Sequence, residues 1–303
     1  MNKKIQDHWD ELIANAPNGL PYAYSWYLDI VTSNRWRGLF DEETGTAMPI
    51  PYGSLFFSFR QMLKLRGWSA HRVVQPVFCQ QLGLFGKRFS DIELFHDYFK
   101  DFMSRVRYVD SYCLNETNRD LPLAVALHRM KIRERTNYVL PLRKTYKGLV
   151  KGYSKSHRRA LEKSKDLIFE EDVLPPADFL GQHRKYVGRR AGLSMRAYIR
   201  WELLIRAVRE RNMGKLISMR TPAGEVASAA FILQSHGRLI YQGGYAVAEK
   251  KDLNPMHALL DALIRRHAGS RLLLDFEGSD IPSIAEFFRR FGAQERKYWM
   301  VYK

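Results

Sequence analysis

Residues 215–247 read KLISMRTPAGEVASAAFILQSHGRLIYQGGYAV, and this segment predicts three consecutive antiparallel strands. Turn signals divide it at 221–224 (TPAG) and at 236–237 (HG), and the runs between them are rich in apolar residues. We expect the strands at 215–220, 226–234 and 238–247. Such a meander is the centre of a sheet, so the other elements can be placed around it.

Helices and strands alternate on both sides of this meander. Before it we expect a strand at 137–142, a basic helix at 145–165, a strand at 168–173 and helices at 176–190 and 195–211. After it come an apolar-striped helix from Asn254-Pro255, a strand at 272–276, a helix capped by Asp280 and Pro282 that stops at Gly292, and a strand at 295–302. The order is neither doubly wound nor a barrel, and it predicts a mixed α/β fold.

The N-terminal half repeats the later part of this order. There we expect a strand at 75–85, a capping box at 90–93 that opens a helix, a strand at 107–114, a helix at 121–130 and a strand at 132–140. Similar elements at similar spacing indicate two copies of one fold. We therefore expect a degenerate N-terminal domain over 1–136 and a C-terminal domain over 137–303.

Composition favours a folded, basic, cytoplasmic protein. The 303 residues carry a net charge of +17, and 46% of them are hydrophobic. We find no signal-peptide pattern, no run of about 20 apolar residues, and only two cysteines, Cys79 and Cys113. Residues 131–215 hold 22 Lys and Arg against 9 Asp and Glu, which favours an anionic partner. A merely basic, solvated surface is the alternative.

Four segments carry a resemblance to a known family: NYVLPL (137–142), YSKSHRRALEK (153–163), LDFEGS (274–279) and AEFFRRFGA (285–293). They resemble the second domain of Fem-type aminoacyltransferases, a tandem-domain bacterial branch of the GNAT (acyl-CoA N-acyltransferase) superfamily. The resemblance implies two tandem GNAT-like domains, each a mixed, mainly antiparallel sheet flanked by helices. It also implies an enzyme, an N-acyltransferase that moves an acyl or aminoacyl group onto an amine acceptor in a cleft between domains.

In the GNAT scheme the third meander strand splays from its neighbour and exposes backbone N–H groups to the acyl carbonyl. Gly243 and Gly244 lie in that strand and permit a bulge and the close approach of a ligand, although an ordinary kinked strand explains them equally well.

The donor's phosphates would lie at the N-terminus of the next helix. The donor-binding candidates there are Lys250, Lys251, Asn254 and His257. The family's glycine-rich loop is missing and Pro255 removes an N–H donor, which leaves acyl-CoA and aminoacyl-tRNA open as donors. We expect no tightly bound cofactor and no metal.

Two carboxylates and a tyrosine are the catalytic candidates. Asp275 and Glu277 alternate along the strand that ends near the acceptor, where one of them would take the proton of the attacking amine. A cap of the following helix is the alternative role. Tyr245 and Tyr298 are candidate proton donors to the leaving group, or core residues.

Basic side chains form a candidate anion-binding set: Lys151, Lys155, Arg158, Arg159, Arg189 and Arg190. They suit a nucleic-acid backbone or a lipid pyrophosphate, and a solvated helix face explains them nearly as well. The alternative to an enzyme is a non-catalytic GNAT-like module that binds RNA or an anionic envelope precursor. Further expected partners are a cell-wall precursor as acceptor and an anionic membrane, but no DNA. The nine histidines, among them His71, His128 and His236, show no close metal-ligand pair.

Overall fold

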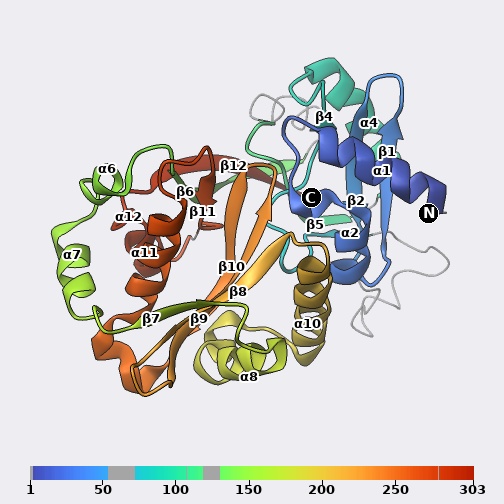
Figure 1. Ribbon diagram of the computed structural model, residues 1–303. Helices are drawn as coiled ribbons and strands as arrows, with labels where there is room; N and C mark the ends of the chain where they lie inside the picture. The colour runs from blue at the N-terminus through green and yellow to red at the C-terminus, as the bar shows by residue number, and fades with distance from the viewer. Residues whose placement is uncertain (1–2, 54–71, 107, 119–129, 279) are drawn as a thin grey trace. The chain divides into compact units, whose positions relative to one another are not determined.

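A computed structural model describes residues 3–53, 72–106, 108–118, 130–278 and 280–303 (Figure 1). The chain divides into two compact units, Met1–Arg135 with Lys297–Lys303, and Thr136–Arg296. The division falls one residue from the domain boundary expected at 136/137. The last seven residues return to the first unit, whereas the sequence placed them in the second domain.

The first unit holds two groups of paired strands and several helices. Its helices are α1 (Lys3–Asn15), η1 (Pro21–Ala23), α2 (Ser25–Thr32) and α4 (Ile92–Arg105). Its strands are β1 (Trp36–Asp41), β2 (Thr46–Pro51), β3 (Arg72–Val74), β4 (Phe85–Gly86), β5 (Tyr108–Cys113) and the end of β12 (Gln294–Tyr302). The strand orders are β1-β2-β4 and β3-β5-β12, with β3 and β5 parallel. Buried aromatic side chains such as Trp9 and Phe99 fill the core.

One expected strand in this unit is wrong. Of residues 75–85 only Phe85 joins a strand, because Phe78 and Gly83 have positive φ angles that interrupt an extended chain. The expected helix start is present: Asp91 is the N-cap of α4, and its side chain accepts a hydrogen bond from the Leu94 N–H. Of the helix expected at 121–130, residues 121–129 lie outside the described residues.

The second unit is built on a mixed, mainly antiparallel sheet in the order β6-β11-β10-β9-β8-β7. Its strands are β6 (Lys131–Pro141), which begins in the first unit, β7 (Ile168–Glu171), β8 (Gly214–Arg220), β9 (Val226–Ser235), β10 (Arg238–Ala246) and β11 (Leu273–Asp275). Only β10 and β11 are parallel. The three meander strands are therefore confirmed to within a residue or two at each end.

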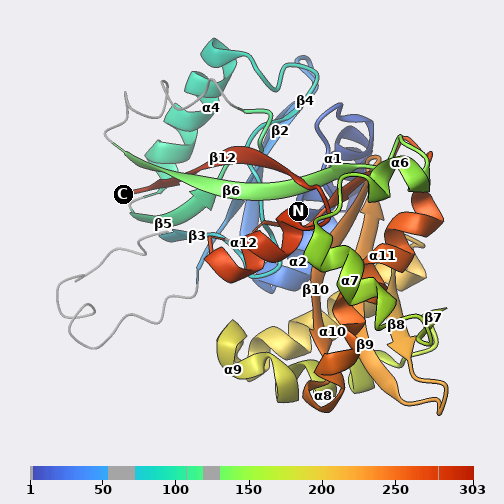
Figure 2. The same ribbon diagram turned by 90° about the vertical axis from the view of Figure 1, so that its left-hand side faces the viewer.

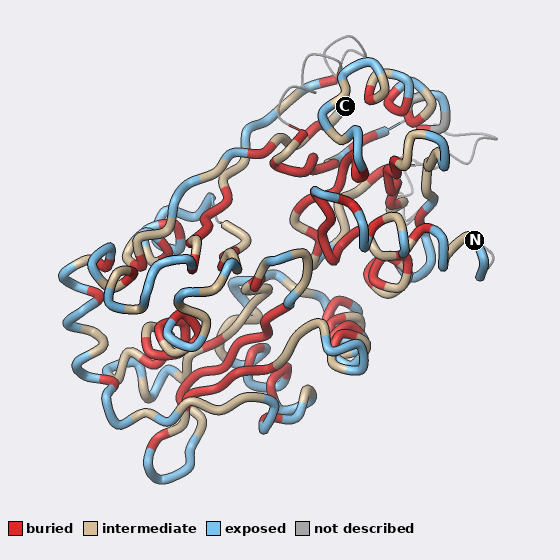
Figure 3. The backbone as a smooth tube through the Cα atoms, turned by 45° about the horizontal axis from the view of Figure 1, so that its top comes forward, coloured by how far each residue is buried: buried red, intermediate tan, exposed pale blue. Residues whose placement is uncertain are grey.

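Helices cover both faces of this sheet (Figures 1 and 2). On one face lie α6 (Tyr146–Val150), α7 (Lys155–Glu162), α11 (Pro255–His267) and α12 (Pro282–Arg289). On the other lie α8 (Pro176–Tyr186), α9 (Gly188–Ala191) and α10 (Met195–Glu210). The residues buried between α11 and the sheet include Leu259, Leu263 and Ile232. Figure 3 shows the buried backbone running along the strands between the two layers.

Three details of the second unit differ from the sequence-based expectation. The basic helix is two helices, because Ser154 caps α7 by accepting a hydrogen bond from the His157 N–H. Ile281, not Asp280, is at the N-cap position of α12. The strands expected at 132–140 and 137–142 form the single strand β6.

Candidate functional site

The parallel strands β10 and β11 separate after a short contact. Arg238, Leu239 and Ile240 pair with Leu273–Asp275, and β11 then ends. Strand β10 continues to Ala246, paired with β9 on its other side. In the part of the chain that the structure describes, no strand therefore covers the β11-facing edge of residues 241–246. Backbone groups on such an open edge are available to a ligand.

The open edge starts at a β-bulge. The register of β10 against β9 shifts between Tyr241 and Gly243, so Gln242 is the extra residue. Its side-chain oxygen accepts a hydrogen bond from Trp201 Nε1 at 3.1 Å. Helix α10 therefore fixes the bulge from one face of the sheet.

The two glycines make room for protein atoms. A Cβ on Gly243 would lie 3.0 Å from the Trp201 ring, and one on Gly244 would lie 2.6 Å from the carbonyl oxygen of Ala229. Packing against α10 and β9 thus accounts for both glycines. That the two glycines bind the donor through their backbone groups stays a prediction.

Asp275 is held in a buried ion pair. Its side chain is 3% exposed and its Oδ2 lies 2.8 Å from Arg238 Nη1, while Oδ1 accepts a hydrogen bond from the Glu277 N–H. Through these bonds Asp275 acts as a brace that links the start of β10 to the end of β11. Its catalytic role stays a prediction.

Glu277 lies just beyond β11 in a strained conformation. Its φ is 55°, and the following Gly278 has φ 58°. A Cβ on Gly278 would lie 2.1 Å from the Thr136 carbonyl oxygen, so the glycine is required there. Non-glycine residues in left-handed backbone are uncommon and cluster at functional sites. The carboxylate is partly exposed where β11 has left β10.

Tyr245 lines a cavity of about 460 Å³ on the α8 side of the sheet. Its side chain is 1% exposed, and its hydroxyl has no hydrogen-bond partner among the described residues. Burial raises the pKa of Tyr245, as do Tyr186 and Asp178, while Arg220 opposes them. The hydroxyl therefore stays protonated. The sequence singled out Tyr245 but gave no sign of this cavity.

The side chains expected to bind phosphate at the start of α11 do not share one contact. Lys250 pairs with Glu225, Asn254 turns its side-chain amide to the Asp252 carbonyl, and Lys251 is exposed. Asn254 is the N-cap residue but makes no side-chain cap hydrogen bond. Lys250, Lys251 and Asn254 are therefore close in sequence, but their side chains do not contact a common group.

His257, in the first turn of α11, packs in an aromatic cluster with His157 and Phe291. Its Nδ1 lies 2.7 Å from Nδ1 of His157, and the His157 ring packs 4.1 Å from that of Phe291, centroid to centroid. The His157 Nε2 is buried without a hydrogen-bond partner among the described residues. The sequence did not reveal this pair, since the two histidines are 100 residues apart. No group of three potential metal ligands occurs in the described ranges.

The histidine pair makes stability depend on pH. Burial lowers the pKa of His157 to about 3, helped by His257 and Arg290, and lowers the pKa of His257 to about 4, helped by Arg290. Because these values lie below the ordinary 6.5, the neutral rings' contribution is complete above pH 6.5 and is lost as pH falls toward 4. We expect wild type to lose about 2 kcal/mol more than His157→Phe between pH 7 and pH 5 in urea unfolding. Equal losses would contradict the buried, neutral pair.

The basic candidates divide between the two faces of the sheet. Lys151, Lys155, Arg158 and Arg159 are exposed on and before α7, and Arg189 and Arg190 are exposed on α9. Helices α7 and α9 lie on opposite faces (Figure 2). The set predicted as one anion-binding region is therefore two regions.

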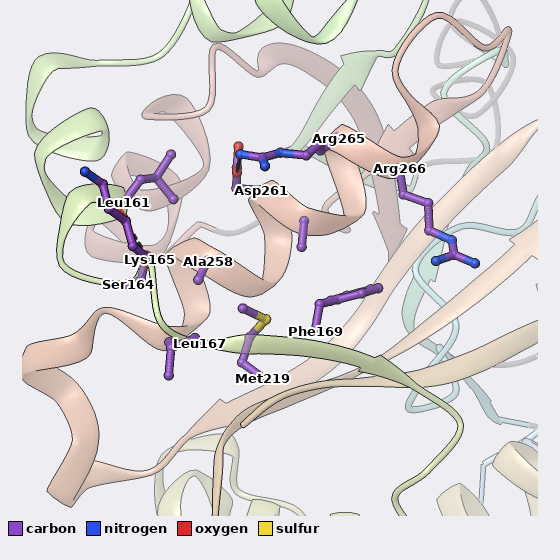
Figure 4. A pocket seen from close by; sticks show the side chains of 11 residues that line it. Leu161, Ser164, Lys165, Leu167, Phe169, Met219, Ala258, Asp261, Arg265 and Arg266 are labelled. Carbon is purple, nitrogen blue, oxygen red and sulfur yellow. Dashed lines mark hydrogen bonds and ion pairs between the residues drawn. The ribbon is translucent and has the colours of Figure 1, made fainter. Parts of the chain in front are cut away.

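A second cavity, of about 440 Å³, lies between α7, β7, β8 and α11 (Figure 4). Phe169 and Met219 form part of its apolar floor, and Asp261 and Arg265 point toward each other from α11. The Asp261 carboxylate accepts hydrogen bonds from the hydroxyls of Tyr146 and Tyr153. These bonds bind α6, its following turn and α11 together, so Asp261 has a structural role.

Several solved structures have a similar fold at low sequence identity. The chain resembles FemX, with a TM-score of 0.70 and 12% identity over 97% of this chain and 95% of that one. It also resembles the C-terminal domain of a putative lysylphosphatidylglycerol synthetase from Agrobacterium fabrum (TM-score 0.57, 11% identity, 100% and 92% covered). L-PGS from Bacillus licheniformis is similar too (0.53, 9%, 100% and 92%).

The chain therefore has a GNAT-like fold of the Fem type, with tandem domains. No protein-family model matches the sequence, and no curated protein matches it. None of the helices in the described ranges is both long and apolar enough to cross a membrane.

Proposed function

We propose that the protein is an aminoacyltransferase that moves an aminoacyl group from tRNA onto an amine. The observation that carries the proposal is the open edge of β10, which begins at the Gln242 bulge where β11 ends. Backbone N–H groups on this edge would bind the carbonyl of the donor ester. Fixed N–H donors stabilise the oxyanion that forms when such a carbonyl is attacked.

An aminoacyl ester fits this chain better than a coenzyme A thioester. The start of α11 offers no glycine loop, Pro255 lacks an N–H, and the His157–His257–Phe291 cluster fills the adjacent space. The exposed cations around α7 suit a nucleic-acid backbone. Aminoacyl-tRNA supplies an ester carbonyl without requiring a pyrophosphate cradle.

The proposed reaction forms a C–N bond and breaks the C–O bond to the tRNA ribose. Glu277 takes a proton from the attacking ammonium group, because it is partly exposed just beyond β11, whereas Asp275 is buried. The Tyr245 hydroxyl donates a hydrogen bond to the developing oxyanion. The attacking nitrogen then loses its second proton, which passes to the ribose oxygen as the C–O bond breaks, so the tRNA leaves with a free hydroxyl. One similar structure is a domain of a putative lysylphosphatidylglycerol synthetase, whose name contains an aminoacylated lipid. By analogy, we propose a cell-envelope precursor as acceptor.

Donor choice can be tested by thermal unfolding of the purified protein. We expect mixed tRNA to raise the melting temperature at low salt, with the rise fading at high salt as counterions compete for the cations. Acetyl-CoA and free CoA should leave the melting temperature unchanged. A salt-tolerant rise with acetyl-CoA would reverse the proposed donor.

Turnover is then measured with tRNA charged with radiolabelled amino acids and a lysine-containing peptidoglycan precursor as acceptor. We expect enzyme-dependent movement of label from the alkali-labile ester to an alkali-stable amide. Binding of tRNA without any such transfer would contradict the enzyme and leave a nucleic-acid-binding module.

A further inference from the structure

Helix α10 presents an apolar stripe to solvent. Met195, Ile199 and Leu203 follow one another at intervals of four residues, and they are 53%, 56% and 52% exposed. Residues four apart lie on one side of a helix, so the three form one continuous strip. The opposite side of α10, with Trp201 and Leu204, packs into the core. The strip is therefore additional to what folding requires.

The chain around the strip is rich in basic residues. Between Arg184 and Arg206 the chain carries seven basic residues and one acidic residue, Glu202, which pairs with Arg206. Arg189, Arg190 and Arg196 are exposed and have no ion pair within the described ranges. Unpaired cations of this kind remain available to an external anion.

The backbone brings the arginines beside the strip. Gly192, with φ 63°, ends α9, and Ser194 caps α10 by accepting a hydrogen bond from the Ala197 N–H. The two helices follow each other within a few residues, and Figure 2 shows α9 next to α8, in the layer that also holds α10. Consecutive elements of one layer thus carry both the arginines and the apolar strip, and we call these residues together the α9–α10 surface: Arg189, Arg190, Met195, Arg196, Ile199 and Leu203.

We propose that the α9–α10 surface docks on an anionic lipid bilayer. The aliphatic side chains would enter the boundary between headgroups and acyl chains, and the arginines would bind lipid phosphates. An RNA-binding surface would instead be expected to present exposed aromatic rings for base stacking, which this strip lacks. The proposal does not rest on the transferase activity, and it concerns the face of the sheet opposite α7.

Vesicle sedimentation of the full chain tests this proposal. At about 0.1 M salt we expect binding to phosphatidylcholine vesicles that contain about 30% phosphatidylglycerol, and much weaker binding to phosphatidylcholine alone. Arg189→Gln/Arg190→Gln should weaken binding by about 30-fold, since each arginine near an anionic surface contributes about fivefold. Ile199→Ser/Leu203→Ser should weaken it by about 10-fold or more.

Lys151→Gln/Lys155→Gln is the matched control, because it removes the same charge from the other face. This variant should keep vesicle binding and lose tRNA affinity, so failure of the docking surface and failure of the proposed function are distinguishable. Equal loss of vesicle binding in both charge variants would overturn the docking surface. So would full binding by the serine variant, or tRNA binding that depends on Arg189 and Arg190 without any vesicle binding.

Discussion

Replacing Asp275 with alanine is expected to lower the free energy of unfolding by about 3–5 kcal/mol, because it removes the carboxylate from a buried ion pair with Arg238. The Arg238 side chain is 14% exposed and lies 2.8 Å from the lost carboxylate. The Glu277 N–H would also lose its acceptor. Urea unfolding of wild type and Asp275→Ala measures the difference.

A double variant separates the missing counter-ion from the lost packing. Arg238→Met/Asp275→Leu removes both charges and keeps apolar bulk, so it should be considerably more stable than Asp275→Ala. Glu277→Ala is the comparison for catalysis, because Glu277 is partly exposed and its replacement should cost much less stability. If the double variant were as unstable as Asp275→Ala, the ion pair would not be the cause.

This result would also change how turnover data are interpreted. A slow Asp275→Ala enzyme is ambiguous, since loss of the brace between β10 and β11 disturbs the open edge itself. If Glu277 is the base, a stable Glu277→Ala protein should transfer on the order of 100-fold more slowly. Only a rate measured on a folded variant assigns the base.

Local sequence patterns could predict the meander and the helices that follow it. Turn signals at 221–224 and 236–237 fix the strand ends, and the apolar stripe of α11 has helical spacing. Interactions within a few residues determine such features. The break between α6 and α7 is also local, and the Ser154 cap was a signal that could have revealed it.

The site could be predicted only in outline, because its contacts join distant segments. Asp275 meets Arg238 from 37 positions away, and His157 meets His257 from 100 positions away. Nothing near Asp275 in the sequence indicates a buried arginine partner. The cavity at Tyr245 depends on where α8 packs relative to the turn between β8 and β9. Periodicity predicts elements, whereas these features depend on how the elements pack.

Tyr245→Phe is expected to slow aminoacyl transfer by about 100- to 1,000-fold, the cost of removing one hydrogen-bond donor to a developing oxyanion. The same change should leave the free energy of unfolding unchanged or raise it by about 1 kcal/mol. The reason is that the hydroxyl is buried without a partner among the described residues, and an unsatisfied buried polar group is destabilising. Opposite effects on rate and stability are typical of a group retained for function.

Tyr198→Phe is the matched control for this prediction. The Tyr198 hydroxyl lies 3.0 Å from Nδ1 of His183 in the same helical layer, so its removal leaves a buried ring nitrogen without its partner. We expect that variant to lose about 1–2 kcal/mol of stability and to keep its transfer rate. A Tyr245→Phe protein with a wild-type rate would exclude the hydroxyl from the reaction. A less stable one would show that another group of the folded protein already forms a hydrogen bond with the hydroxyl.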